Sequence, residues 1–284
     1  MNFVKMHAHG NDYIYLNEDD VKNSDLPLLA ERLSNRHLGV GGDGIITVKR
    51  LSDKELKMRI FNTDKSEGLT CGNGLRCAHL FAKNYLGDTD DEVTVFTKSG
   101  ATVSRLIGKG QTVRNGKIIS TPSECDFLAP SFKENGEFLS KELKKVGLYV
   151  DNQEIFEVNT GNNHLVFLTD RYQTKELSDA INQTGLFPDG INIERVYSVK
   201  KTGEYSYLLG VDFYERGSGK TLSCGSGTVA LSSAFSLFIG KPFCPRLSIE
   251  ARGEVGCQSV SFWGKTVRLR GYINEVFRGE IYEV

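Results

Sequence analysis

Two cysteines, Cys71 and Cys224, occupy nearly identical sequence frames about half a chain apart. Each is followed by Gly at the next position and at the third, and each then enters an apolar run. An aromatic residue stands ten positions before each cysteine, Phe61 in one frame and Tyr214 in the other. Because the glycines clear side chains from the backbone where a helix is expected to begin, the first N–H groups of that helix are free to bind an anion. The repeated frame therefore predicts a duplicated half-site.

A thiol at such a position can exchange a proton near neutral pH. Its ordinary pKa is about 8.5, and the N-terminus of a helix is one of the settings that lower it. Each cysteine can then act as a base or as an acid. Inversion of a carbon that bears a hydrogen needs one group to remove a proton from one face and another to deliver a proton to the opposite face. Two thiols on opposing faces would meet both needs, and the helix N–H groups would stabilise a substrate carboxylate that gains enolate character.

The duplication extends beyond the cysteines, because the Gly-Asn pair at 10–11 recurs at 161–162, an offset of 151 residues. Elements that recur in the same order at a nearly constant offset indicate two homologous lobes. A chain of 284 residues is also long enough for two domains. We expect an N-terminal lobe of residues 1–120 plus 272–284, and a C-terminal lobe of residues 121–271, each with one cysteine frame.

Both lobes alternate between strand and helix patterns. The expected helices cover residues 26–36, 75–86, 174–183 and 228–239. The expected strands cover residues 3–6, 44–49, 56–61, 92–97, 101–107, 163–168 and 207–214, and the tail over 272–284 is expected to return as a strand to the first lobe. The last helix carries no charged residue, so we expect it to be buried on every side, wrapped by a curved sheet. The polar stretches 109–115 and 131–145 receive no element.

The composition excludes several classes of partner. The chain has 35 basic and 36 acidic residues without a block of like charge, which argues against nucleic acid and favours a small-molecule ligand. It shows neither a signal peptide nor the roughly 20 apolar residues of a membrane helix, so we expect a cytoplasmic protein that binds no membrane. The other four cysteines form no CxxC pair and are interpreted as reduced core residues: Cys77, Cys125, Cys244 and Cys257.

Two weaker motifs are interpreted as structural. Residues 39–44 contain GxGxxG, but they follow an expected helix and precede an expected strand, the reverse of the order in dinucleotide-binding units. A turn is therefore expected there. His7 and His9 could hold a metal ion only with a third ligand, and none stands at a recognisable spacing, so we expect no metal.

The longer runs around both cysteines resemble the diaminopimelate epimerase family. The matching runs are Phe61-Asn62-Thr63-Asp64-Lys65-Ser66-Glu67 before Cys71-Gly72-Asn73-Gly74-Leu75-Arg76-Cys77, Tyr214-Glu215-Arg216-Gly217-Ser218-Gly219 before Cys224-Gly225-Ser226-Gly227, and Lys5-Met6-His7 with Gly10-Asn11-Asp12. In this order they span nearly the whole chain and are far more specific than one glycine-rich loop. The resemblance implies an α/β (α+β) fold of two pseudo-symmetric lobes, each a mixed, curved sheet around a central helix, with the active site in the cleft between them. It also implies a cofactor-independent two-base epimerase that is active with both thiols reduced.

The resemblance also implies roles for individual residues. Cys71 and Cys224 match the two bases, and the backbone cradle for the reacting carboxylate matches Gly72, Asn73, Gly225 and Ser226. The substrate-binding positions match Asn11, Asn62, Asn162, Asn192, Glu215 and Arg216. Arg216 has an independent physical case, since a guanidinium fork fits a second substrate carboxylate bidentately. The structural alternatives are a surface ion pair between Glu215 and Arg216, and turn formation by the asparagines.

The chain departs from the family pattern at four positions that bear on the substrate: Ala8, His9, Asn163 and Lys220. Conversion of LL-2,6-diaminopimelate to the meso form, a step toward lysine and peptidoglycan, is the first choice of reaction. A racemase of the same family that acts on another amino acid, such as histidine, is the alternative. We interpret His7 and His164 as residues that satisfy buried hydrogen bonds.

Two hypotheses from other classes stay open. In a Cys-His hydrolase or acyl transferase, Cys71 or Cys224 would attack and His79 or His164 would act as the base. This reaction leaves the second thiol without a task. A two-lobe amino-acid-binding protein would need the clefts but not the thiols. In every case the expected partner is a small amino-acid ligand, and whether the chain forms a homodimer is left open.

Overall fold

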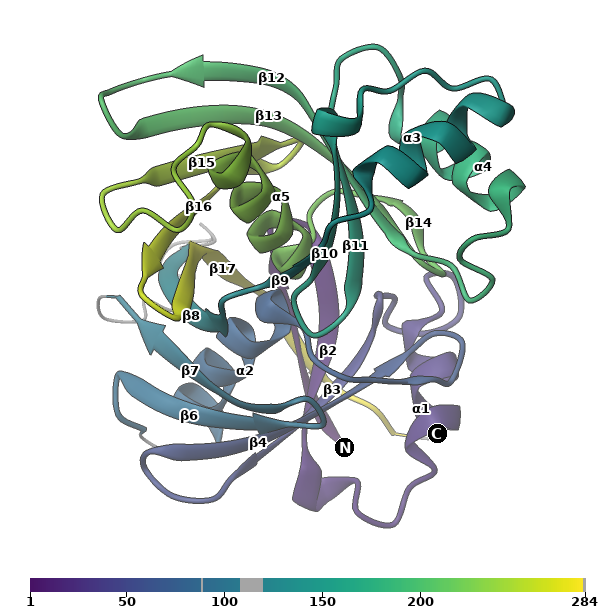
Figure 1. Cartoon of the computed structure of the whole chain (residues 1–284). Coiled ribbons are helices and arrows are strands. Elements are labelled where there is room, and N and C mark those ends of the chain that lie inside the picture. Colours follow the sequence, from purple (N-terminus) through teal and green to yellow (C-terminus); the bar gives the residue numbers. More distant parts are fainter. Residues whose placement is uncertain (88, 108–119, 283–284) are drawn as a thin grey trace. The chain divides into compact units, whose positions relative to one another are not determined.

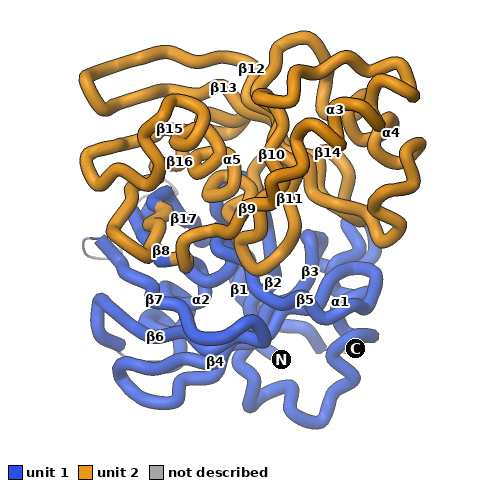
Figure 2. Tube along the Cα trace, in the orientation of Figure 1, with its two compact units in different colours: residues 1–126, 270–284 blue, residues 127–269 orange. Residues whose placement is uncertain are grey.

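The computed structural model describes residues 1–87, 89–107 and 120–282, which form two compact units (Figure 2). Unit 1 contains residues 1–126 and 270–284, and unit 2 contains residues 127–269. Within the described residues, no helix combines the length and the apolar character that a membrane crossing requires. The polar stretch 109–115 lies outside the described residues.

Unit 1 is a mixed sheet that surrounds helix α2 (Figure 1). Its strands are β1 (Asn2–Ala8), β2 (Asn11–Asn17), β3 (Gly44–Arg50), β4 (Glu55–Asn62), β5 (Glu67–Gly68), β6 (Glu92–Thr97), β7 (Gly100–Leu106), β8 (Thr121–Leu128) and β17 (Thr266–Glu280), of which β8 and β17 run across the boundary of the unit. Its helices are η1 (Glu18–Asp20), α1 (Leu26–Ser34) and α2 (Gly72–Tyr85). The strands follow each other in the order β17-β1-β2-β3-β4-β6-β7-β8, and β8 pairs in turn with β17.

Helix α2 forms the centre of the larger core of unit 1. Its buried residues pack with apolar side chains of the surrounding strands, among them Met6, Ile46 and Val95. Helix α1 covers the other side of the sheet and packs on a second cluster that includes Ile14 and Phe61. The sheet therefore holds α2 on one face and α1 on the other.

Unit 2 contains its own mixed sheet. Its strands are β9 (Ser131–Lys133), β10 (Ile155–Asn159), β11 (Asn163–Leu168), β12 (Asn192–Lys201), β13 (Ser206–Glu215), β14 (Gly219–Thr221), β15 (Ser248–Gly253) and β16 (Gly256–Trp263). Its helices are α3 (Gly136–Lys145), η2 (Asn152–Glu154), α4 (Thr174–Thr184) and α5 (Gly225–Phe238). The order β9-β10-β11-β12-β13-β15-β16 contains parallel steps from β11 to β12 and from β13 to β15.

The two units repeat one topology. In unit 1, β1-β2 is antiparallel, β2-β3 parallel, β3-β4 antiparallel, β4-β6 parallel and β6-β7 antiparallel. The same five steps occur in unit 2 along β10-β11-β12-β13-β15-β16. Helices α1 and α4 occupy matching places in the chain, and so do α2 and α5. The internal duplication expected from the sequence is thus present in the strand order.

Helix α5 is enclosed over most of its length, as its charge-free sequence predicted, but the expectation fails at its last turn, where Phe238 is half exposed. Every residue from Gly225 to Ser236 is buried, and strands on several sides contact the helix. Its serines lie inside the protein together with its apolar residues. A charged side chain on this helix would be buried, and because a buried unpaired charge is costly, its sequence carries none.

Three expected boundaries were wrong. Helices α2 and α5 begin at Gly72 and Gly225, three residues before the expected starts, because the glycine turns are already helical. The stretch 131–145, which received no element, contains strand β9 and helix α3. Helix α3 is mostly polar and buries only Leu139 and Leu143, so its apolar pattern is short.

Candidate active site

Each cysteine of the two frames is the N-cap residue of its helix. Cys71 has extended backbone angles, φ −148° and ψ 113°, and its sulfur accepts the N–H of Gly74 at 3.3 Å. Cys224 repeats this arrangement with φ −127°, ψ 119° and a 3.3 Å contact to the N–H of Gly227. An N-cap side chain satisfies one of the four N–H groups that a helix start leaves without a partner. Both sulfurs therefore sit at the positive end of a helix dipole.

Asn11 holds the sulfur of Cys71 from the neighbouring strand. The Cys71 thiol donates to Asn11 Oδ1 at 3.3 Å, and Asn11 Nδ2 donates to Asp43 Oδ2 at 2.9 Å. The β1-β2 hairpin that presents Asn11 turns through His9 and Gly10, both with positive φ (52° and 87°), as two-residue hairpin turns require. Asn11 is therefore fixed by two side chains on different elements.

An ion network anchors the support of Asn11. Arg36 donates to both Asp12 and Asp43, with nitrogen-to-oxygen distances of 2.8 Å and 2.9 Å, and Lys5 pairs with Asp12 at 2.6 Å. The hydrogen bond from Arg36 and the charges of Lys5 and Arg36 lower the pKa of Asp12, although burial of the carboxyl opposes this. Burial and the neighbouring Asp12 raise the pKa of Asp43. The sequence analysis did not single out Asp43, because the carboxylate follows an expected turn and carries no local motif.

Arg76 stands behind the glycine turn that follows Cys71. Its side chain is fully buried, its Nε donates to the Gly72 carbonyl at 3.2 Å, and its Nη2 donates to Asn73 Oδ1. Its Nη1 has no hydrogen-bond partner among the described residues. A guanidinium in this position orders the first turn of α2 and brings positive charge to the place where the cradle is expected.

Asn62 lies at the end of β4, in the turn toward β5. Its Nδ2 donates to Ser66 Oγ at 2.9 Å, and its backbone N–H donates to the Ser66 carbonyl at the same distance. The half-exposed amide is therefore part of a turn, as the structural alternative for the asparagines stated. Its expected role in substrate binding stays a prediction.

Cys224 is more enclosed than Cys71 and lies among acidic groups. Its sulfur is buried and lies 3.5 Å from Ser226 Oγ. Burial, followed by the charges of Glu215 and Glu194, raises the pKa of Cys224 well above its usual value. The helix N-terminus was expected to lower this pKa, and for Cys224 that expectation was wrong because burial and two carboxyls outweigh the helix end.

Glu215 lies at the end of β13 and faces Cys224. Thr221 donates its hydroxyl to Glu215 Oε1 at 2.6 Å. Burial of the carboxyl raises the pKa of Glu215, while the hydrogen bonds from Thr221 and Cys224 act in the opposite direction. Arg216 is exposed and forms no ion pair with a described residue, so the surface pair between Glu215 and Arg216 is absent from the described part of the chain.

His164 and Glu194 form a buried pair in unit 2. Both side chains have 0% exposure, and His164 Nδ1 lies 2.7 Å from Glu194 Oε1. His164 thus satisfies a buried hydrogen bond, as interpreted from the sequence. Glu194 was missed, although a carboxylate within the otherwise apolar start of β12 is a signal that could have identified it.

The remaining expected residues of unit 2 lie near the first residues of β11 and β12. Asn192 is buried, donates to the Asn163 carbonyl at 3.1 Å and accepts the N–H of Arg216 at 3.0 Å. Asn162 lies in the turn between β10 and β11, and its Oδ1 is buried without a partner among the described residues. The aliphatic stem of Arg216 lies against Gly190, where an added Cβ would approach it to 3.0 Å.

The competing motifs have structural explanations. Both nitrogens of His79 are engaged, Nδ1 by Ser104 at 3.3 Å and Nε2 by the Asp90 carbonyl at 2.9 Å, which leaves none for a thiol. Burial lowers the pKa of His79 to about 4. His7 Nδ1 accepts the N–H of Gly10, and His9 Nε2 accepts a backbone N–H from β17 at 3.2 Å. Residues 39–43 lie in the loop between α1 and β3, and Gly44 begins β3, so the turn interpretation is confirmed.

The other cysteines and Lys220 lie outside this chemistry. Burial raises the pKa values of Cys77 and Cys125 to about 12, as expected of core thiols. Cys244 and Cys257 are only half-buried, so their interpretation as core residues was wrong. All six cysteines of the chain are free. Lys220 is exposed and forms a surface ion pair with Glu254.

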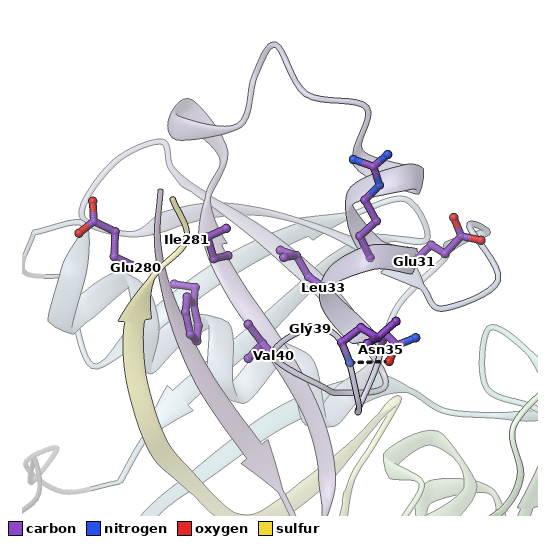
Figure 3. A pocket seen from close by; sticks show the side chains of 10 residues that line it. Glu31, Leu33, Asn35, Gly39, Val40, Glu280 and Ile281 are labelled. Carbon is purple, nitrogen blue, oxygen red and sulfur yellow. Dashed lines mark hydrogen bonds between the residues drawn. The ribbon is translucent and has the colours of Figure 1, made fainter. Parts of the chain in front are cut away.

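A hollow of about 810 Å³ lies in unit 1 beside the end of α1 (Figure 3). Leu33, Val40 and Ile281 line it, and the turn at its edge is closed by a 2.9 Å hydrogen bond from the Gly39 N–H to the Asn35 carbonyl. None of its lining residues belongs to a cysteine frame. We therefore assign the chemistry to the helix starts and not to this hollow.

Comparison with solved structures shows that the two-unit fold is shared. A phenazine biosynthesis protein of the PhzF family from Bacillus anthracis matches with a TM-score of 0.70 and 16% identity, covering 100% of this chain and 99% of the other. A hydroxyproline epimerase from Agrobacterium vitis matches with a TM-score of 0.60 and 12% identity, covering 99% and 90%. At these identities the likeness establishes the fold alone.

Sequence comparison defines the family. The diaminopimelate epimerase model matches residues 3–120 and 156–258, which include both cysteine frames. A diaminopimelate epimerase of Caldanaerobacter subterraneus subsp. tengcongensis is 32% identical over 289 residues and covers 99% of both chains, and one of Bacillus thuringiensis is 33% identical over 250 residues, covering 84% and 82%. The chain belongs to the diaminopimelate epimerase family. It is an isomerase, an amino-acid epimerase of this family.

Proposed function

We propose that the protein inverts the α-carbon of an amino acid through two thiols, and that LL-2,6-diaminopimelate, converted to its meso form, is the substrate. The observation that carries the proposal is the shared N-cap geometry of Cys71 and Cys224, each with its sulfur at 3.3 Å from the third N–H of its helix. Relatives named diaminopimelate epimerase, at 32% and 33% identity, support the choice of substrate. The product would serve lysine and peptidoglycan synthesis in the cytoplasm.

The proposed reaction consists of two proton transfers. A thiolate removes the α-proton, so that an S–H bond forms, the C–H bond breaks and the electron pair moves toward the α-carboxylate. The second thiol delivers its proton to the opposite face of the carbon and becomes a thiolate. The mechanism requires the substrate complex to hold Cys71 and Cys224 on opposite faces of one carbon. No oxidant or cofactor takes part.

Backbone N–H groups at the two helix starts would hold the reacting carboxylate. Gly72 and Asn73 open α2, and Gly225 and Ser226 open α5, so each helix offers N–H groups at its positive end. The hydrogen bonds from these N–H groups to the carboxylate become stronger as the carboxylate takes up enolate charge. They would therefore stabilise the transition state more than the bound substrate, which lowers the barrier. The exposed guanidinium of Arg216 is available for the distal carboxylate of diaminopimelate.

The test is exchange of the α-proton in deuterated water. The wild-type protein is expected to introduce deuterium at the α-carbon of LL-diaminopimelate and to form the meso isomer, while a panel of other amino acids, histidine included, is inverted more slowly. Cys71→Ala and Cys224→Ala should each abolish turnover, and the Ser variants should leave only weak activity, because a hydroxyl is a far poorer base. Near-normal inversion by either Ala variant would refute the two-thiol mechanism. An acyl-enzyme mass adduct would indicate a hydrolase instead.

A further inference from the structure

Glu194 is a fully buried carboxylate that no lysine or arginine neutralises within the described residues. Its only hydrogen-bond partner there is His164, whose Nδ1 lies 2.7 Å from Oε1, and Oε2 has no partner. A buried carboxylate without a lysine or arginine partner is costly and is found where it has a task. Glu194 lies on β12 against the first turn of α5, and this position indicates what that task is.

The internal duplication identifies the counterpart of Glu194 in unit 1. Ile193 pairs with Tyr214 as Ile45 pairs with Phe61, so the residues that follow, Glu194 and Ile46, are equivalent. Both end against the first turn of the central helix of their unit. A Cβ added to Gly74 would lie 2.7 Å from Ile46 Cδ1, and one added to Gly227 would lie 2.5 Å from Glu194 Oε1. The same place is thus apolar in one half-site and acidic in the other.

A second pair of equivalent positions carries the opposite charge. Five residues after Cys71 stands Arg76, and five residues after Cys224 stands Val229, and both are fully buried. Arg76 forms no ion pair with a described residue. The half-site of unit 1 therefore has a buried cation beside its helix start, whereas the half-site of unit 2 has a buried carboxylate.

The groups that act on Cys224 come from three elements. Glu215 lies on β13 and Glu194 on β12, while α5 contributes the Ser226 hydroxyl and the Gly227 N–H; His164 on β11 contacts Glu194. The charges of Glu215 and Glu194 act with burial to raise the pKa of Cys224, whereas the bonds from α5 act against them. Carboxylates beside a thiol oppose the thiolate, because two like charges would share a poorly solvated site.

We propose that Glu194 is a positioning residue that keeps the proton on Cys224 in the resting enzyme and fixes the ring of His164 through Nδ1. This inference rests on the proposed two-thiol function and adds a direction to it. The catalytic cycle starts with Cys71 as the thiolate that removes the α-proton and Cys224 as the thiol that donates. After turnover the thiolate is on Cys224, and a proton must pass from Cys71 to solvent and from solvent to Cys224 before the next cycle.

Alkylation resolved by residue tests the inference without any turnover. The protein is treated with iodoacetamide between pH 6 and pH 10 and then digested with trypsin. Peptide 66–76 contains Cys71 alone, whereas peptide 221–246 contains Cys224 and Cys244 because trypsin does not cleave between Lys241 and Pro242, so fragment-ion spectra assign the alkylated cysteine in this second peptide. In the wild type, Cys224 should react more slowly than Cys71 at pH 7.5. In Glu194→Gln, the rate at Cys224 should rise by about tenfold at this pH, which corresponds to a fall of about one unit in its apparent pKa, and the rate at Cys71 should not change.

Two variants serve as controls. Glu157→Gln removes another buried carboxylate of unit 2, one that Lys133 and Asn135 hold on β10, and it should leave both alkylation profiles unchanged. Glu194→Asp keeps the charge and should keep Cys224 slow. An unchanged Cys224 profile in folded Glu194→Gln would overturn the inference, and so would faster alkylation of Cys224 than of Cys71 in the wild type, a measurement that needs no variant to fold. If the wild type exchanges no α-proton with any amino acid, the proposed function fails while the alkylation result still stands by itself.

Discussion

Replacement of His79 by Gln tests how burial governs the titratable groups around α2. His79 has 0% exposure, and its two nitrogens are engaged by the Ser104 hydroxyl and the Asp90 carbonyl. Burial, the largest cause, and the nearby Lys83 lower its pKa to about 4, while the hydrogen bond to Asp90 and the charge of Asp91 act in the opposite direction. In the unfolded chain a histidine has a pKa of about 6.5.

The sign and size of the effect follow from this difference. Between pH 6.5 and pH 4 the unfolded chain binds the proton of His79 and the folded protein does not, so the free energy of unfolding falls as the pH falls. At about 1.4 kcal/mol per pH unit, the loss reaches about 2.5 kcal/mol at pH 4.5 and about 3 kcal/mol when complete. The stabilising contribution is fully present above pH 6.5.

The assay is urea unfolding at pH 7.5 and pH 4.5, followed by hydrogen exchange of the α2 amides so that unit 1 is measured by itself. The difference in unfolding free energy between the two pH values should be about 2.5 kcal/mol smaller in His79→Gln than in the wild type. His37→Gln, which changes an exposed histidine, should retain the wild-type difference. An identical pH dependence in His79→Gln and the wild type would refute the reasoning.

Three further predictions concern the half-site of unit 1. Gly74→Ala places a Cβ 2.7 Å from an isoleucine of β3 and should lower the free energy of unfolding by about 1–3 kcal/mol, measured by thermal unfolding. Gly68→Ala, whose Cβ would lie 3.6 Å from its nearest neighbour, should be nearly neutral. Equal melting temperatures of the two variants would contradict this. Asp43→Asn weakens a charged acceptor of the Asn11 amide and should raise the KM for diaminopimelate about tenfold with a smaller change in kcat, so a change confined to kcat would argue against it. Arg76→Met removes two hydrogen bonds at the start of α2 and should lower kcat/KM about thirtyfold. Arg76→Lys, which keeps the charge, should partly restore it. Equal kcat/KM values for the two variants would show that the charge is unimportant.

The sequence predicted the features that depend on pattern. Helix α5 was identified as a buried element because it lacks charge from Thr228 onward. Most of the longer strands of unit 1 were located from their β-branched runs, whereas only β11 and β13 were located in unit 2. The duplication was visible because spacing survives when side chains change. The first turns of α2 and α5 were missed since glycines have low helix propensity, and the sulfur that caps each turn has no signature in periodicity.

The electrostatics of the site could not be predicted from the sequence. The sequence analysis assigned both thiols one setting, a helix N-terminus, yet Cys224 lies beside Glu215 and Glu194, which are nine and thirty residues away in the chain. The pKa of a group depends on burial and on neighbours that long-range folding brings together. The same limit applies to Arg76, whose burial a helical position alone does not reveal.

The return of β17 to unit 1 sets an order on the folding of the chain during synthesis. Unit 2 is a continuous segment, whereas unit 1 needs residues 273–280 of β17 to pair along β1. A ribosome therefore synthesises all of unit 2 before the last strand of unit 1 is complete, and the N-terminal strands must wait with one edge open. Contacts between the two ends of a chain form slowly, so this interval is when the nascent protein is most exposed to aggregation and most dependent on chaperones.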